Sequence, residues 1–261
     1  MVGMIQFPAD WEVTEAGAGR VTFEEGGVRM AVHPNDGTRY SNAQVTDYGF
    51  KAQAHAFHFR WRPPLRLTVR ARATAAGGAL HGTAGFGFWN HPFSPDVQRF
   101  PRLPQAIWFF FASPPSNMAL ARGVPGHGWK AAQIDATRRR LLALAPLAPL
   151  AALAYRSHRL YDRWYPPLQR AMRIGEHLLD PGLLADWHTY VIEWRVNGAR
   201  FAVDGDMVLE TASAPSGPAG FIAWMDTRWA VVTPQGRLSF GLTPVADPQA
   251  LLMESVEIET L

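Results

Sequence analysis

Apolar and polar residues alternate with a period of two along much of this chain, as expected of strands with one buried face. The clearest run is 65–73, where every second residue is apolar and those between are Arg or Thr. A hairpin is predicted at 20–33. Further strands are predicted at 48–60, 82–89, 106–112, 220–225, 230–232, 238–242 and 252–258, many of them separated by Pro, Gly or Asn. This pattern predicts an all-β sandwich or jelly roll.

The strongest local signal lies at 187–205. Apolar side chains alternate with polar ones over 190–194 and again over 201–203. Asn197-Gly198 lies between the two runs, and Asn-Gly is a preferred pair for a type I′ turn because both central residues need positive φ. Asp204-Gly205 follows as a second turn pair. We therefore predict a hairpin over these residues.

The segment 136–184 departs from this pattern. Leu141, Leu142, Leu144, Leu147, Leu150 and Leu153 recur at helix-like spacing, and Leu160, Trp164, Leu168 and Met172 follow. Pro146 and Pro149 interrupt the first run and Pro166-Pro167 the second, so short helices are expected. We predict one β-sandwich domain over 1–261 that carries a helical insertion at 136–184. The insertion fits three roles: a cap that buries its leucine face on the sandwich, a lid over the concave face, or a docking surface.

Positive charge is concentrated in this insertion. The chain carries a formal charge of +3, and between residues 136 and 175 there are eight Arg against one acid. A contact with a membrane surface or a protein through 138–173 is therefore one possible role. A nucleic acid partner is not expected, because the Arg residues lie among leucines and no basic stripe occurs elsewhere.

Metal and cofactor patterns are absent from the sequence. The chain has no Cys, and His55 and His58 would project from opposite faces of a strand, so we predict no metal site. There is no G-x-G-x-x-G, P-loop or G-x-S-x-G motif, and no cofactor is expected. The first residues lack a basic segment followed by a long apolar run, so no signal peptide is predicted and a cytoplasmic location is expected.

The hairpin Trp187-His188-Thr189-Tyr190 to Val203-Asp204-Gly205 resembles the "WHTY-x-I-x-W … VDG" hairpin of laminarinase-like glycoside hydrolases of family 16 and their concanavalin A-like relatives. Residues 65–89 resemble the strand pair that ends in Phe-Trp in those enzymes, and 252–258 resemble their final strand. The resemblance implies a concanavalin A-like jelly-roll β-sandwich. It also directs attention to the strand that carries catalysis in that family.

That catalytic strand carries Glu-x-Asp-x-x-Glu, in which the two glutamates serve as nucleophile and general acid/base, about 5–5.5 Å apart in a retaining enzyme. The corresponding segment here is 104–113, and it contains no carboxylate. Trp108 and Phe110 stand where the acids would be. Retaining hydrolysis of the family type is therefore not expected, and whether the chain is an enzyme at all stays open.

Three functional hypotheses remain. The first is a non-hydrolytic binding protein with an aromatic-lined cleft for a saccharide, by resemblance, or for a less polar small molecule, by the character of the lining. The second is an enzyme of different chemistry in which Asp226 or His91 acts as a general base in a closed apolar pocket. The third is a membrane-surface or partner-binding module that acts through the insertion.

The binding hypothesis rests on a defined set of side chains. Trp89, Trp108, Phe110, Trp224 and Trp229 would supply stacking surfaces, and Asn42, Gln44, Asn90, His91 and Asp226 would orient the ligand. Several of these residues also fit structural roles. Trp89 suits a core strand, 90–92 suits a turn, 40–44 suits a solvated strand face, and Asp226 suits a loop closed with Arg228.

Overall fold

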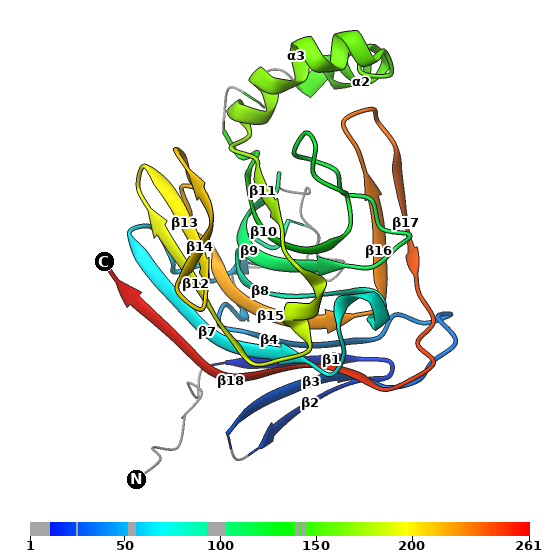
Figure 1. Cartoon of the computed structure of the whole chain (residues 1–261), viewed down its shortest axis with the longest axis vertical. Helices are drawn as coiled ribbons and strands as arrows, with labels where there is room; N and C mark the ends of the chain where they lie inside the picture. The colour runs from blue at the N-terminus through cyan, green and yellow to red at the C-terminus, as the bar shows by residue number, and fades with distance from the viewer. Residues whose placement is uncertain (1–10, 25, 52–55, 93–102, 139–140, 142–144) are drawn as a thin grey trace.

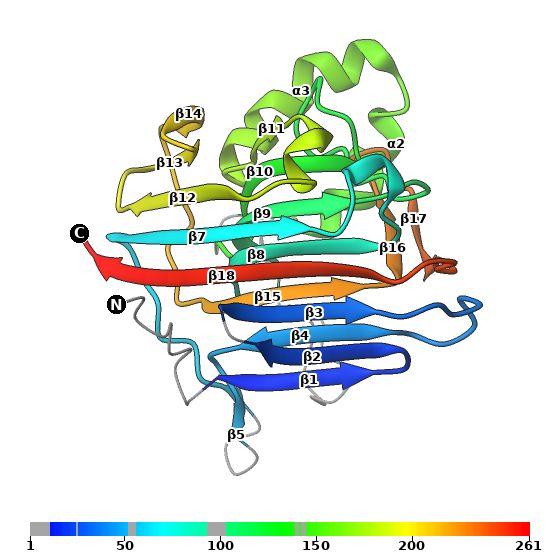
Figure 2. The ribbon, with the colours of Figure 1, turned by 60° about the horizontal axis from the view of Figure 1, so that its bottom comes forward.

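The computed structural model describes residues 11–24, 26–51, 56–92, 103–138, 141 and 145–261. The expectations for the first residues and for His55, Leu142 and Leu144 lie outside them. Two seven-stranded antiparallel sheets face each other (Figure 1). Their strands run in similar directions, as in an aligned sandwich (Figure 2).

The first sheet, sheet A, carries the candidate site on the face that points away from the second sheet. Its strands in spatial order are β1 (Glu12–Ala16), β4 (Asn42–Thr46), β15 (Gly220–Asp226), β8 (Thr83–Trp89), β9 (Gln105–Ala112), β10 (Gly128–Asp135) and β11 (Gly175–Leu178).

The second sheet, sheet B, closes the other side of the core. Its strands in spatial order are β14 (Asp206–Thr211), β13 (Gly198–Val203), β12 (His188–Arg195), β7 (Leu65–Ala73), β18 (Gln249–Thr260), β3 (Gly27–Val32) and β2 (Gly19–Glu24).

The remaining elements decorate this sandwich. Two small sheets pair β16 (Arg228–Val232) with β17 (Leu238–Leu242) and β5 (Phe50–Lys51) with β6 (Ala56–Phe57). The helices are α2 (Ala148–Ala154) and α3 (His158–Ala171), with short 3₁₀ turns η2 (Gly77–Ala79), η3 (Ala145–Leu147) and η4 (Pro181–Leu184). In the described part of the chain, no helix is both long enough and apolar enough to span a membrane.

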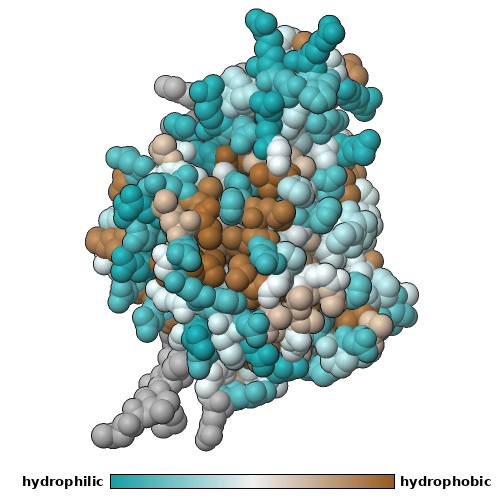
Figure 3. All heavy atoms as spheres, viewed as in Figure 1, coloured by the Kyte–Doolittle hydropathy of each residue, from teal (hydrophilic) through white to brown (hydrophobic). Residues whose placement is uncertain are grey.

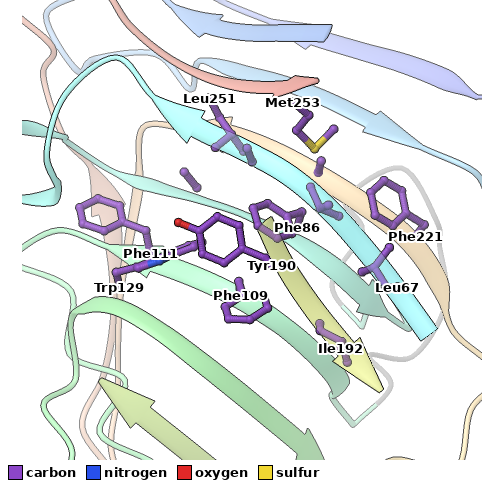
Figure 4. Packing of buried hydrophobic residues seen from close by; sticks show 14 of the residues in the cluster. Leu67, Phe86, Phe109, Phe111, Trp129, Tyr190, Ile192, Phe221, Leu251 and Met253 are labelled. Carbon is purple, nitrogen blue, oxygen red and sulfur yellow. The ribbon is translucent and has the colours of Figure 1, made fainter. Parts of the chain in front are cut away.

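Aromatic side chains fill the space between the two sheets. The ring of Tyr190 from sheet B lies 4.9 Å from that of Phe109, 5.3 Å from that of Phe86 and 5.6 Å from that of Trp129, in each case edge to face. Figure 4 shows these rings interdigitating with the aliphatic side chains around them. Edge-to-face pairs of this kind add to the burial energy of a core and fix its geometry.

The outer face of sheet B is a charged, solvated surface. Along β7, buried apolar residues alternate strictly with partly exposed ones, as the sequence predicts. The polar positions form cross-strand ion pairs, which the structure shows at Arg66–Glu193, Arg70–Glu254 and Arg200–Glu210. Such cross-strand ion pairs are typical of an antiparallel sheet with one solvent-exposed face.

The predicted hairpin is confirmed, and its turn lies one residue earlier in the chain than predicted. Arg195 pairs with Gly198, so the connecting residues are 196–197 and Gly198 already belongs to β13. Gly198 is needed there for a different reason, since an added Cβ would lie 2.5 Å from the carbonyl oxygen of Thr211. The type I′ conformation occurs at the next turn, where Asp204 and Gly205 have φ of 51° and 91°.

The insertion is less helical than expected. α2 and α3 lie within 136–184, but so does β11, which pairs with β10 as the edge strand of sheet A. Pro166 and Pro167 lie inside α3 rather than between two helices. Leu147, Leu150 and Leu153 are exposed, so the expectation that these leucines pack on the sandwich is wrong.

A pair of glycines tests the role of the Asp204-Gly205 turn. Gly205 and Gly78 both have open space around an added Cβ, but only Gly205 has positive φ. We expect Gly205→Ala to lower the free energy of unfolding by about 1–2 kcal/mol, the cost of a left-handed L-residue. Gly78→Ala should stay within about 0.5 kcal/mol of the wild type in the same urea titration. Equal effects of the two changes would contradict this account.

Candidate functional site: an aromatic layer on the outer face of sheet A

Strand β9 divides its aromatic residues between two faces. Ile107, Phe109 and Phe111 are buried in the core between the sheets. Trp108 and Phe110 project from the opposite face of sheet A and are half-buried. Since side chains alternate along a strand, burial of the first three residues forces the other two outward.

Four rings from three adjacent strands form one continuous surface, which we call the aromatic layer: Trp89, Trp108, Phe110 and Trp224. The ring of Trp108 stacks on that of Phe110 at 5.3 Å, with 19° between the planes. The centroid of Trp108 also lies 5.4 Å from Trp224 and 5.7 Å from Trp89. Four of the five predicted stacking residues are therefore brought together.

Two glycines on β8 make this layer possible. Gly85 lies in register between Trp224 on one neighbouring strand and Phe110 on the other, and Gly87 lies beside Trp108. A Cβ added to Gly87 would stand 2.6 Å from the Cβ of Trp108, and one added to Gly85 would stand 3.0 Å from the ring of Trp224. Without side chains at these positions, rings from β9 and β15 meet above β8.

A hydrogen-bonded trio borders the layer at one end. The indole N–H of Trp89 donates to the hydroxyl of Tyr48 at 2.7 Å, and that hydroxyl lies 3.0 Å from Nδ1 of His91. Burial raises the pKa of Tyr48, so the phenol keeps its proton. The Tyr48 hydroxyl therefore connects the indole of Trp89 to the imidazole of His91.

Loop and insertion residues border the other side of the layer. Leu120 and Val124, between β9 and β10, and Met172, after α3, belong to an apolar cluster that also includes Trp89 and Trp108. This contact explains why the rings are half-buried rather than fully exposed.

Asp226 occupies a separate polar position beside Trp224. Its carboxylate accepts hydrogen bonds from the hydroxyls of Thr83 at 2.7 Å and Tyr40 at 2.9 Å, and from the backbone N–H of Arg228 at 3.1 Å. Burial raises its pKa, although these hydrogen bonds lower it. Thr83 in turn accepts the indole N–H of Trp224 at 2.9 Å, so the carboxylate helps to orient one ring of the layer.

Two of the predicted polar residues lie along β4. Gln44 is half-buried and stands in register with Trp224, at the edge of the layer. Asn42 is buried beside Asp226, and its side-chain oxygen has no hydrogen-bond partner in the described part of the protein.

Two other predicted residues are engaged elsewhere. Trp229 lies in the β16–β17 hairpin over Gly241, whose added Cβ would stand 2.4 Å from the indole, and the structure gives it no ring contact with the layer. The side chain of Asn90 accepts from the backbone N–H of Gln105 and donates to the carbonyl of Leu103, both at 3.0 Å. This geometry ties Asn90 to the backbone at the start of β9.

A buried ion pair next to the layer was not predicted. Lys130 stands in register with Phe110, and its Nζ lies 3.4 Å from a carboxylate oxygen of Glu176. Only 2% and 7% of these two side chains are exposed. Burial lowers the pKa of Lys130 and raises that of Glu176, whose other oxygen accepts the N–H of Ala121 at 2.9 Å. The pair holds the loop before β10 against the sheet.

The described residues contain no group of three His, Cys, Asp or Glu that could hold a metal ion. Neither a protein-family model nor a curated protein matches the sequence. Solved structures, in contrast, match over nearly the whole chain.

Three of them define the fold. A β-1,3-1,4-glucanase (lichenase) from a mouse hindgut metagenome aligns with 11% identity and a TM-score of 0.51, covering 98% of this chain and 96% of that chain. A family 16 endo-glucanase from Bacteroides ovatus aligns with 10% identity and a TM-score of 0.51, covering 97% and 96%. The carbohydrate recognition domain of Emp47p aligns with 13% identity and a TM-score of 0.50, covering 98% and 90%. The chain has the concanavalin A-like jelly-roll fold of these proteins.

The buried position of Asp226 yields a prediction about pH. Because its folded pKa lies above the ordinary 3.8, the folded state binds the proton more tightly. Its contribution to stability is present below pH 3.8 and is lost as the pH rises through the folded pKa. Urea titrations between about pH 3 and pH 6 measure this effect. The difference in free energy of unfolding, wild type minus Asp226→Asn, should fall as the pH rises.

Asp204 supplies a control of opposite sign. Burial raises its pKa, but hydrogen bonds from His188 and the N–H of Thr189 outweigh burial and lower it. Its contribution is present above pH 3.8 and is lost as the pH falls through the folded pKa, so wild type relative to Asp204→Asn should lose stability toward low pH. Parallel curves for the two variants would contradict the assignment.

The Lys130–Glu176 pair yields a prediction about stability. Lys130→Met leaves the carboxylate of Glu176 buried without its partner, and should lower the free energy of unfolding by about 3–5 kcal/mol. Adding Glu176→Gln removes that charge while the amide oxygen still accepts from Ala121. The double variant should therefore recover most of the loss in a denaturant titration, and additive losses would show that the two groups are not coupled.

Proposed function

We propose that this protein binds a saccharide, without hydrolysing it, on the aromatic layer of sheet A. The observation that carries the proposal is the contrast between the two outer faces. On sheet B, ion pairs join the outer faces of β7, β12 and β18 and of β13 and β14, whereas sheet A places the rings of Trp89, Trp108 and Phe110 half-buried on its outer face. Large rings gathered on one surface are typical of ligand-binding surfaces.

The layer offers apolar contact in a fixed geometry. Trp108 and Phe110 are stacked on each other, with 5.3 Å between their centroids and 19° between their planes, so each ring limits the movement of the other. The indole N–H groups of Trp89 and Trp224 are already bonded within the protein, to Tyr48 and Thr83. The layer therefore contributes apolar contact, and hydroxyl recognition falls to side chains at its edge, such as Gln44.

The fold supports a saccharide over a less polar small molecule. The structural neighbours are two glucanases and a carbohydrate recognition domain, all on the same concanavalin A-like scaffold. Fold alone does not carry function, so the proposal depends on the layer and uses the neighbours only to choose between ligand classes.

The chemistry of β9 and its surroundings supports binding without hydrolysis. β9 reads Gln-Ala-Ile-Trp-Phe-Phe-Phe-Ala and provides no carboxylate. Of the two predicted alternative bases, Nδ1 of His91 is hydrogen-bonded to Tyr48. Asp226 accepts three hydrogen bonds with its two oxygens and orients Trp224 through Thr83. A general base needs an oxygen within reach of the substrate proton, and here both oxygens are committed to the protein.

Loss of one ring should weaken binding. A glycan array with the purified chain should identify a bound saccharide, and titration of its intrinsic fluorescence should give the affinity. Trp108→Ala should weaken that affinity by roughly thirtyfold, the effect of about 2 kcal/mol at a binding hot spot. Phe110→Ala should weaken it as well, and incubation with the bound glycan should release no reducing ends.

Trp164→Ala is the matched control, because Trp164 lies on α3 and is 51% exposed away from the layer. It should bind like the wild type. An array on which no glycan binds, or an equal loss for Trp164→Ala and Trp108→Ala, would overturn the proposal.

A further inference from the structure

The helical insertion has one side fixed to the protein. Ala152 of α2 faces the tip of the β16–β17 hairpin, where a Cβ added to Gly236 would lie 2.9 Å from the Cβ of Ala152. Tyr155 is buried at the end of α2, with its ring 5.6 Å from that of Tyr165. The hydroxyl of Tyr165 donates to the carbonyl of Leu120 at 2.5 Å. The orientation of α2 is therefore set by these contacts.

The other side of α2 is apolar and exposed. Leu147, Leu150 and Leu153, which we call the leucine ridge, are 54%, 66% and 60% exposed. At about 100° per residue, a spacing of three places them within about 120° of the helix circumference, on the side away from Ala152. A ridge of leucines in water is unfavourable, and its orientation is held by the anchored side of the helix.

Neighbouring elements also expose apolar side chains. Leu238 and Phe240 alternate on one face of β17 and are 69% and 57% exposed, and Trp164 of α3 is 51% exposed. These elements lie at the same end of the molecule as α2 (Figure 1). Of the thirteen large hydrophobic side chains that are exposed in the described residues, six belong to this one end.

Positive charge lies on the residues that follow the leucine ridge. Arg156, Arg159 and Arg163 are exposed and make no ion pair within the described residues. Asp162, the only acid between residues 136 and 175, is bonded to Arg122 and His158. In Figure 3 the helical end, at the top of the view, shows hydrophobic residues set among hydrophilic ones.

We propose that this end of the protein docks on the surface of a bilayer that contains anionic lipids. The leucine ridge would enter the boundary between headgroups and acyl chains, while the arginines contact lipid phosphates. A bilayer is the occupant that the charges favour. A second copy of the chain on the same face would bring two sets of unpaired arginines together, and their repulsion opposes self-association. The proposal does not depend on the aromatic layer or its ligand.

Vesicle flotation tests this docking with the full chain. Wild type should float with vesicles of phosphatidylcholine and phosphatidylglycerol, should not float with pure phosphatidylcholine vesicles, and should dissociate as salt rises. Leu150→Ser/Leu153→Ser should weaken the partition coefficient by about tenfold or more, because two exposed leucines lose their burial in lipid. Arg156→Gln/Arg159→Gln/Arg163→Gln should weaken it to a similar degree and reduce its salt dependence.

Controls distinguish lipid binding from nonspecific hydrophobic association and from misfolding. Phe23→Ser/Met207→Ser removes two side chains that are 53% and 60% exposed on sheet B, and should float like the wild type. Circular dichroism should show that all variants keep the wild-type fold.

Three results would overturn the proposal. The first is equal flotation with neutral and anionic vesicles, or none with either. The second is flotation of the leucine variant at the wild-type level. The third is self-association in sedimentation that the leucine variant abolishes, without vesicle binding, which would identify a second copy as the occupant.

Discussion

The packing of aromatic rings between the two sheets determines most of what this molecule presents to its surroundings. Phe109 is buried against Tyr190 and Phe201, with centroid distances of 4.9 Å and 5.6 Å. Because a strand shows its side chains alternately, this one contact fixes the register of β9 and sends Trp108 and Phe110 to the opposite face. A slip by one residue would exchange the core with the aromatic layer.

The outward rings then depend on what lies beneath and beside them. Gly85 and Gly87 remove the side chains of β8 that would otherwise separate the rings of β9 and β15. Thr83 links the indole of Trp224 to Asp226 and so fixes its tilt. The surface is thus preorganised by the protein, which lowers the entropic cost of binding a rigid ligand.

Local patterns in the sequence predicted the architecture and part of the layer. Alternation located β7 and β8, turn residues located the β12–β13 hairpin, and the family resemblance of residues 104–113 placed Trp108 and Phe110 on the outward face of β9. Position along the sequence did not show that Trp229 would lie outside the layer, because its strand pairs with β17 in a separate two-stranded sheet. The sequence pattern predicts the turn between β12 and β13 one residue too late. Gly198 lies outside the turn, at the start of β13, where it permits close approach of the backbone of β14.

Interactions between segments far apart in the sequence could not be predicted from local patterns. Lys130 and Glu176 meet because β10 and β11 are neighbours, and β11 lies in a stretch whose leucine spacing indicated only helix. The bonds of Asp226 to Tyr40 and Thr83 span 186 and 143 residues. Each such contact is a consequence of tertiary structure, and no run of neighbouring residues encodes it.

The bare surface of β8 also constrains how this protein can change over time. Gly85 and Gly87 touch rings contributed by two other strands, so a side chain gained at either glycine collides with Trp108 or Trp224. Conversely, replacing a large ring with a small residue leaves an unfilled hollow above the glycines. The atoms nearest to an added Cβ, however, are backbone carbonyl oxygens of β9, that of Phe109 at 2.3 Å for Gly85 and that of Ile107 at 2.5 Å for Gly87. A smaller ring would not relieve those contacts, so the two glycines are fixed by the backbone and this face can change only at the ring positions.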